Sequence, residues 1–209
     1  MRHVAERLAG EMADDVRSPA YGWGRLSTEV LHEGPHLTLR RDRVLQPHGV
    51  EGTYEHITVA DGARIVAVDG NGRVALVEDD VYPLGGRLLH VPGGGVAPGE
   101  APRDAARREC EEETGFRPGA LCLMTVFHPL PSRTAAATYM YLATDLHRAT
   151  PRRDPTEAGM TVRWTPLAEA VRAVETGAVS EAGSVIGLLL AERLLHVERS
   201  CLPGEPSAV

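Results

Sequence analysis

"PGGGVAPGEAPRDAARRECEEETGF", residues 92–116, is the most informative stretch of the chain, because it sets a dense group of acids behind three consecutive glycines. Four glutamates crowd into five positions: Glu109, Glu111, Glu112 and Glu113. Like charges at helical spacing repel one another. The flanking residues nevertheless predict a helix over 102–114, since Pro102 suits a first turn and Gly115 suits a C-terminal cap with positive φ.

On that helix Glu109 and Glu113 lie four residues apart and share a face, with Glu112 one turn from Glu109. Three carboxylates this close stay ionised together at low cost only when a cation lies among them. An all-oxygen ligand set favours magnesium or manganese. Acid-rich helices are more often simply solvated faces, so the spacing of this run has to decide between the two interpretations.

Arg108 has two possible acidic partners. It lies four residues before Glu112, which allows an ion pair along the helix, and it can also reach Glu100 across the preceding loop. The glycines before the helix have no Cβ, so their backbone groups can approach a ligand closely. Glu111 has no such assignment, and we expect it to be solvated.

Composition excludes several classes of protein. The 209 residues are 43% apolar and 24% charged, which is ordinary for a globular chain, and the net charge of −7 argues against a nucleic-acid surface. No apolar run approaches the roughly 18 residues of a membrane span. Three cysteines without metal-type spacing favour a reduced setting. We therefore expect a cytoplasmic protein with no nucleic-acid or membrane partner.

The order of elements predicts a mixed α+β fold. Short β-branched segments precede the central helix, two more strands and a last strand follow it, and helical segments close the chain. Asp69-Gly70-Asn71-Gly72 between "RIVAVD" and "RVALVED" is a strong hairpin signal. The expected divisions are an arm or short helix at 1–20, an N-terminal strand region at 21–57, a main domain at 58–198 and a disordered tail at 199–209.

The stretch also resembles the signature of a known family. It matches the Nudix box, G-x5-E-x7-R-E-U-x-E-E-x-G-U with U apolar, at every fixed position. These positions are Gly94, Glu100, Arg108, Glu109, Cys110, Glu112, Glu113, Gly115 and Phe116. On these residues the chain is identified as a member of the Nudix hydrolases, which hydrolyse a nucleoside diphosphate linked to another group.

The resemblance implies an α/β/α sandwich with a mixed central sheet, in which the box forms a metal-binding loop–helix–loop. Glu109 and Glu113 would be metal ligands, and Glu112 a further ligand or a group that positions water. Gly93 would offer its carbonyl oxygen to the metal, and Gly94 would lie against the substrate. Arg108 would brace the loop together with Glu100. Metal ions would polarise the phosphoryl oxygens and deprotonate the attacking water.

Segments outside the box are similar to the ADP-ribose and nucleotide-sugar pyrophosphatase group. They include "WGRLSTEVLHEGPHLTLRRDRVLQPHG", "VYPLGGRLLHVPGGG" and "RWTPLAEAVRAVETGAV". Pro131 stands where that group carries a characteristic proline. Such enzymes are typically homodimers whose N-terminal strands help to build the partner's site, so we expect a homodimer. Tyr54 and Arg43, with Arg40 and Arg41, belong either to a substrate or dimer surface or to ordinary strand surface.

The group's general base, or an extra metal ligand, is usually a glutamate before the last strand. Glu157 is the candidate here, with Asp154 in reserve and a solvated loop acid as the alternative. Two departures concern the substrate. "VEDDVYP" places Glu78 and Val81 where the group often has basic residues, and "HVPGG" places His90 where the group often has an acid.

The leading hypothesis is metal-dependent hydrolysis of ADP-ribose or another nucleotide sugar to a nucleoside monophosphate and a sugar phosphate. One alternative is a pyrophosphohydrolase of nucleoside triphosphates, which the N-terminal segment disfavours because such enzymes are commonly shorter. Another is a catalytically silent Nudix module that senses a nucleotide, which the intact box argues against.

Overall fold

The computed structural model describes residues 22–150 and 159–200. The described residues form two compact units: those up to residue 58 with 132–134, and those from 59 to 131 with those after 134. The predicted arm at 1–20, Asp154, Glu157 and the tail from 201 lie outside the described residues. Within the described part of the chain, no helix has both the length and the apolar character to cross a membrane.

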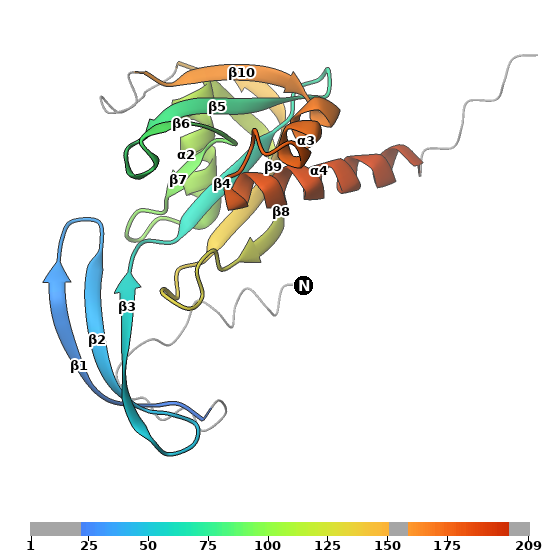
Figure 1. The fold of residues 1–209 in the computed structure, drawn as a ribbon. Coiled ribbons are helices and arrows are strands. Elements are labelled where there is room, and N and C mark those ends of the chain that lie inside the picture. The colour runs from blue at the N-terminus through green and yellow to red at the C-terminus, as the bar shows by residue number, and fades with distance from the viewer. Residues whose placement is uncertain (1–21, 151–158, 201–209) are drawn as a thin grey trace, which may run out of the picture. The chain divides into compact units, whose positions relative to one another are not determined.

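The first unit is an antiparallel sheet of three strands in the order β1-β2-β3 (Figure 1). The strands are β1 (Gly24–Glu33), β2 (Thr38–Leu45) and β3 (Glu51–Thr58). Residues from Ser27 to Glu33 of the edge strand β1 are all exposed along the chain. The predicted N-terminal antiparallel strand region is therefore present, with a free edge that offers unpaired backbone groups.

The second unit contains a mixed sheet in the order β7-β4-β9-β8, in which β4 and β9 are parallel and the other pairs antiparallel. Beside it lies a three-stranded antiparallel sheet in the order β10-β5-β6. The strands of the mixed sheet are β4 (Gly62–Ala67), β7 (Gly93–Gly95), β8 (Phe116–Phe127) and β9 (Thr138–Arg148). Those of the other sheet are β5 (Arg73–Val81), β6 (Gly86–His90) and β10 (Thr161–Pro166), and the 3-10 turn Tyr82–Leu84 joins β5 to β6.

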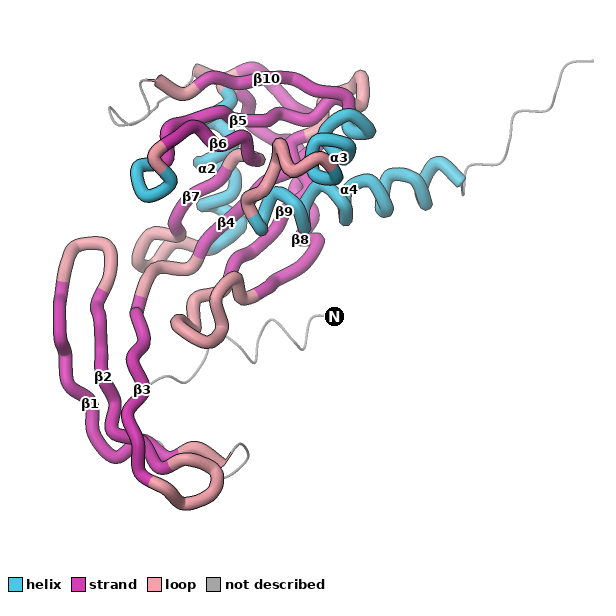
Figure 2. Tube along the Cα trace, in the orientation of Figure 1, coloured by secondary structure: helices cyan, strands magenta, loops and turns pink. Residues whose placement is uncertain are grey.

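Helices cover both faces of the mixed sheet (Figure 2). Alternate residues of β4 face opposite ways: Ile65 packs in a cluster with α2 (Pro102–Thr114), and Val66 packs in a cluster with α3 (Leu167–Glu175) and α4 (Ala182–Ser200). A strand that is buried on both faces has a continuous run of apolar residues, and "IVAV", residues 65–68, is such a run. The predicted α/β/α sandwich with a mixed central sheet is confirmed.

The turn after β4 forms as predicted, but the hairpin that it closes is short. The Asp69 carboxylate accepts hydrogen bonds from the backbone N–H groups of Asn71 and Arg73, both at 2.9 Å. Beyond the turn, only an isolated bridge joins Val68 to Val74, and β4 and β5 enter different sheets. The predicted turn is therefore confirmed, but the antiparallel pairing it starts ends at Val68 and Val74, because β4 takes β7 and β9 as its partners.

The glycines before α2 are ordered rather than loose. Gly93, Gly94 and Gly95 form β7, an edge strand paired with the start of β4, and Gly93 is buried. A Cβ at Gly93 would clash with the Ala63 carbonyl oxygen, and the φ of this residue is +147°. This position requires glycine because two backbones pass each other closely there.

Candidate active site

Helix α2 has the bounds that the sequence predicts, from Pro102 to Thr114. Proline at the first helical position leaves no additional N–H unpaired, and Gly115 ends the helix at φ 73°, where its N–H donates to the Glu111 carbonyl at 3.0 Å. The helix buries a stripe of small side chains, Ala105, Ala106 and Cys110, against β4 and its neighbours. Burial raises the pKa of the Cys110 thiol to about 11, so this cysteine is inert.

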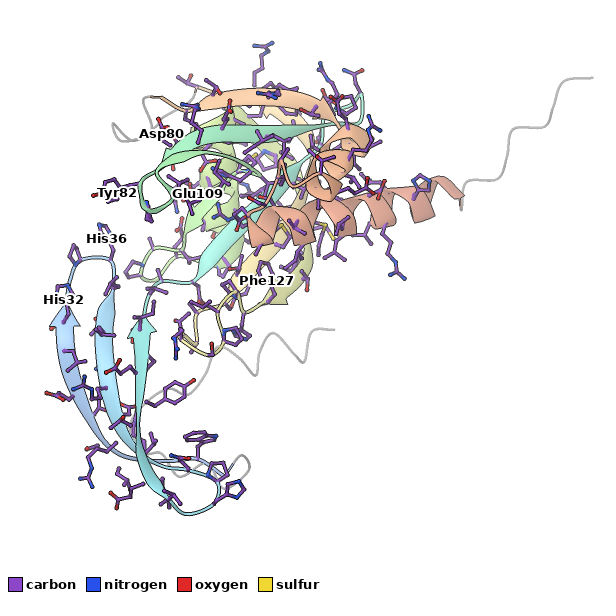
Figure 3. All side chains as sticks on the ribbon, in the orientation of Figure 1. His32, His36, Asp80, Tyr82, Glu109 and Phe127 are labelled. Carbon is purple, nitrogen blue, oxygen red and sulfur yellow. The ribbon has the colours of Figure 1, made fainter. Side chains whose placement is uncertain are left out.

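Two box carboxylates are buried where α2 faces the β7 glycines, and one of them, Glu109, is labelled in Figure 3. Glu109 is 8% exposed and Glu113 is 3% exposed, whereas Glu112 is only partly buried. The N–H of Gly93 donates to Glu113 Oε2 at 3.3 Å. A Cβ on Gly94 would overlap Glu109 Oε1, so a glycine there gives that carboxylate its space.

Arg108 binds the acids and the backbone around it through all five N–H groups of its guanidinium. Nε and Nη2 donate to the two oxygens of Glu100, both at 3.0 Å. Nη1 donates to Glu109 at 2.7 Å and to Glu112 at 3.1 Å, and Nη2 also donates to the Gly95 carbonyl at 3.0 Å. Both predicted partners of Arg108 are therefore present. The arginine links the β7–α2 loop, the helix and β7.

The charges of this network stabilise one another. Hydrogen bonds to Glu100 raise the pKa of Arg108, so the guanidinium stays charged at any working pH. The same hydrogen bonds hold the pKa of Glu100 below its ordinary value. The guanidinium thereby offsets part of the negative charge of the acids around it.

A second arginine holds the other end of the glycine strand. Arg64, in β4, donates from Nη1 to the Gly93 carbonyl at 2.8 Å, and its Nη2 lies 3.9 Å from Glu181. Ser184, fully buried in α4, accepts a hydrogen bond from the Val91 N–H at 2.9 Å. The start of α4 is thus tied to the segment that precedes the box.

Sequence reasoning did not identify Arg64, Glu181 or Ser184. One signal was available for Arg64, since a single charge stands at the start of the otherwise apolar run "RIVAV". No local pattern relates it to Glu181, which is more than a hundred residues away. Only the packing of α4 against β4 brings the two together.

The donor set fits a hard divalent cation. Glu109, Glu112 and Glu113 supply oxygen ligands, and burying several carboxylates close together without a cation is costly. Among the residues that the structure describes, no three acidic, histidine or cysteine side chains stand in a finished metal-ligand arrangement. Because Arg108 binds both Glu109 and Glu112, those carboxylates would have to turn from the guanidinium to a cation.

Two residues at the upstream departures have structural contacts. The His90 ring contacts the Val91 carbonyl through Nδ1 at 2.9 Å. Burial lowers the pKa of His90, that contact partly offsets the effect, and the charge of Arg64 lowers it further, so His90 is neutral at pH 7. Glu78 lies 3.6 Å from Arg163 and 4.0 Å from Arg87, which makes it part of an ion-pair group on the β10-β5-β6 sheet.

The remaining predicted residues belong to the first unit or to loops. Arg43 pairs with Glu51 at 2.7 Å, and the Tyr54 hydroxyl donates to the Ser132 carbonyl at 2.8 Å, both within the first unit. Pro131 is exposed in the loop between β8 and β9. Glu157 and Asp154 are among the residues not described. Glu111, expected to be solvated, instead forms an ion pair with Arg117 at 2.8 Å.

Comparison with known families agrees with this geometry. Residues 58–187 match the NUDIX domain, and residues 23–57 match the nucleoside diphosphate sugar hydrolase N-terminal domain. Among solved structures, one described as an ADP compounds hydrolase superposes with a TM-score of 0.76 at 20% identity, covering 89% of this chain and 98% of the other. That match concerns the fold alone.

Curated relatives cover most of the chain. An ADP-ribose pyrophosphatase of Mycobacterium tuberculosis is 34% identical over 166 residues, which are 78% of this chain and 80% of the relative. A CMP-5'-(N-acetyl-N-hydroxy-3-aminopropyl)phosphonate hydrolase of Streptomyces rubellomurinus is 32% identical over 168 residues, 80% and 81% of the two chains. With its box assembled on α2 and a family match over most of its length, the chain belongs to the Nudix hydrolases.

Proposed function

We propose that this enzyme hydrolyses the pyrophosphate bond of a nucleoside diphosphate derivative, with ADP-ribose or another nucleotide sugar as the leading candidate substrate. The products are a nucleoside monophosphate and a sugar phosphate. The proposal rests on the burial of Glu109 and Glu113 against the β7 glycines, because carboxylates buried close together suit a divalent cation, and such a cation binds phosphates.

Glu109, Glu112 and Glu113 would hold magnesium or manganese, with the Gly93 carbonyl as a further oxygen ligand. A bound divalent ion supplies charge neutralisation at the phosphates and a more acidic water. The Gly93 carbonyl already accepts a hydrogen bond from Arg64, so only its second lone pair remains for a metal. Gly94 gives the Glu109 carboxylate its space beside β7, and Arg108 holds Glu109 and Glu112 at the site until they turn to a cation.

The reaction needs a group that accepts a proton from water. Glu112 is less buried than Glu109 and Glu113, and it is placed to position or deprotonate a water at the edge of the site. Glu157 is the further candidate base, on the resemblance of its loop to that of related enzymes. Pro131, Tyr54 and Arg43 remain candidate substrate contacts on the same ground.

The choice of substrate rests on the relatives. Two similar proteins, from Mycobacterium tuberculosis and Bacillus subtilis, are ADP-ribose pyrophosphatases, and the N-terminal match is to a nucleoside diphosphate sugar hydrolase domain. The chain itself departs from that group at Glu78 and Val81, where the group often has basic residues, and at His90, where it often has an acid. The class of substrate is therefore proposed at the level of nucleoside diphosphate derivatives, with ADP-ribose as the first compound to test.

We also propose that the enzyme is a cytoplasmic homodimer that pairs through its first unit. Leu26 and Val30 on β1 are each 48% exposed, and β1 is an edge strand, so this sheet carries apolar side chains and backbone groups for a partner. Cys110 and Cys122 carry free thiols, which suits a reducing compartment.

A substrate panel tests the proposal. Purified enzyme with magnesium or manganese would receive nucleotide sugars, dinucleotides and nucleoside triphosphates, with products identified by mass spectrometry. We expect a nucleoside monophosphate and a sugar phosphate from nucleotide sugars. Pyrophosphate release from triphosphates alone, or tight binding with no turnover of any compound, would contradict the proposal.

A further inference from the structure

Two arginines flank the β7 glycines, and they differ in how many donors they have left. Arg108 donates to the Gly95 carbonyl and Arg64 donates to the Gly93 carbonyl. A guanidinium carries five N–H groups. Those of Arg108 are all directed at Glu100, Glu109, Glu112 and Gly95. Arg108 therefore has no free donor unless Glu109 and Glu112 turn from it to a cation, and even then Nε and Nη2 stay bound to Glu100 and Gly95.

To the residues that the structure describes, Arg64 makes a single hydrogen bond, from Nη1 to the Gly93 carbonyl. Within the described part of the chain, its Nε and Nη2 donate no hydrogen bond, and the Nη2 distance of 3.9 Å to Glu181 is too long for one. The Arg64 side chain is 25% exposed, so solvent and ligands can reach it. Its spare donors lie beside the glycine strand that adjoins the buried carboxylates.

Glu181 balances the charge of Arg64 without using its donors. One Glu181 oxygen accepts from the Gly183 N–H at 2.9 Å, and the other accepts from the N–H and the hydroxyl of Ser184 at 2.6 and 2.7 Å. The carboxylate is thus committed to capping the start of α4. It stabilises the buried part of Arg64 and leaves the guanidinium fork available.

An anionic substrate that approaches the β7 glycines would be repelled by the acids there unless a cationic group such as the Arg64 guanidinium binds it. The box glutamates are negative, and the segment 78–81 on β5 reads Glu-Asp-Asp-Val with no basic residue. We infer that Arg64 contacts a phosphate of the substrate and sets the affinity for the diphosphate group. The inference rests on the proposed function. A guanidinium matches phosphate oxygens with two parallel hydrogen bonds, which an ammonium group cannot do.

Two substitutions separate phosphate contact from positioning of the glycine strand. Arg64→Gln removes the charge but keeps an amide donor for the Gly93 carbonyl, and Arg64→Lys keeps the charge without the fork. If Arg64 contacts phosphate, Arg64→Gln should raise KM for ADP-ribose about 10- to 100-fold with a smaller change in kcat. Arg64→Lys should lie between wild type and Arg64→Gln.

A second readout does not depend on turnover. Calorimetric titration of the metal-free enzyme with ADP should show weaker binding in Arg64→Gln by a similar factor. Arg117→Gln is the matched control, since Arg117 is an exposed arginine that pairs with Glu111 outside the site. Its ADP affinity should stay within about twofold of wild type, because an exposed pair contributes little.

The outcomes are distinct. Wild-type KM and wild-type ADP affinity in Arg64→Gln would overturn the inference. So would equal losses in Arg64→Gln and Arg64→Lys that track a fall in thermal stability, because that pattern belongs to a purely structural arginine. If the wild type turns over no nucleoside diphosphate derivative, the proposed function fails, and the ADP titration still decides the role of Arg64.

Discussion

Gly94 and Glu109 show how one residue without a side chain shapes the site. A Cβ at position 94 would overlap Glu109 Oε1, so there is no room for a methyl group unless Glu109 moves. The Glu109 carboxylate is the far end of a flexible side chain, so it can swing aside at modest cost to stability. Its place beside Glu113 and its 2.7 Å contact with Arg108 would then be lost.

Gly94→Ala should therefore lower kcat/KM by about 100-fold, since a misplacement of about 1 Å in a catalytic group costs on that order. The thermal unfolding midpoint should change little. Gly95→Ala is the matched control, because a Cβ there would have nothing within 4 Å, and its carbonyl would still accept from Arg108. Equal activity in the two variants would show that Glu109 does not need its present position.

Residues of the site differ in how far the sequence reveals them. The contacts of Arg108 with Glu100 and Glu112 follow from a spacing of eight and four residues within one loop and one helix, so they could be predicted. The contact of Arg64 with Gly93 joins two strands through tertiary pairing, and no local spacing encodes it. Glu111 was misjudged because its partner, Arg117, lies beyond the helix.

Immediately before helix α4, the Glu181 side chain accepts three hydrogen bonds, from the Gly183 N–H and from the N–H and hydroxyl of Ser184. Burial raises the pKa of Glu181, but the charge of Arg64 and the hydrogen bonds at the helix start together lower it by more. The net pKa therefore lies below the ordinary 4.5. A carboxyl group with a lowered folded-state pKa stabilises the fold above its unfolded-state pKa. That stabilisation is lost as pH falls through the folded-state value.

Glu181→Gln should accordingly be less stable than wild type at pH 7, and the difference between the two should shrink as pH falls below about 4.5. Urea unfolding between pH 3 and pH 7 measures this. Glu192→Gln on the same helix is the control, because the Glu192 side chain forms no hydrogen bond or ion pair within the described part of the chain. A wild-type-to-variant difference that stays constant with pH would show that the Glu181 charge does not stabilise the helix start.

Elements with strong local signals could be predicted, and those made by pairing could not. Helix α2 has the predicted bounds because Pro102 and Gly115 define its ends chemically. Strand β7 was missed because three glycines carry no strand propensity, and it exists only through its pairing with β4. The hairpin after β4 stays short for the same kind of reason, since sheet partners outside the local sequence decide where each strand goes.

At the level of the complete chain, the first unit buries too little apolar surface to be stable on its own. Its three strands bury few side chains, and Leu26, Val30 and Leu37 are each at least 40% exposed. A sheet with exposed apolar residues and a free edge is stabilised by covering both. This is the physical ground for the proposed homodimer.

Light scattering after size exclusion should give wild-type enzyme a mass of twice the 22.5 kDa chain. The double variant Leu26→Arg and Val30→Arg should shift it toward the single-chain mass, because two buried unpaired charges oppose association. Leu194→Arg on α4, at a residue that is 42% exposed, is the matched control and should leave the mass unchanged. A single-chain mass for the wild type would contradict the dimer.

Catalysis by this chain depends, in our proposal, on the carboxylates gathered on α2. The decisive experiment compares kcat/KM for ADP-ribose with magnesium in Glu113→Gln and Glu111→Gln. Each variant replaces one carboxylate of the same helix by an uncharged amide. We expect a loss of about 100-fold or more in Glu113→Gln, whose carboxylate faces β7, and a change within about threefold in Glu111→Gln. Full metal-dependent activity in Glu113→Gln would contradict the proposed role of these carboxylates.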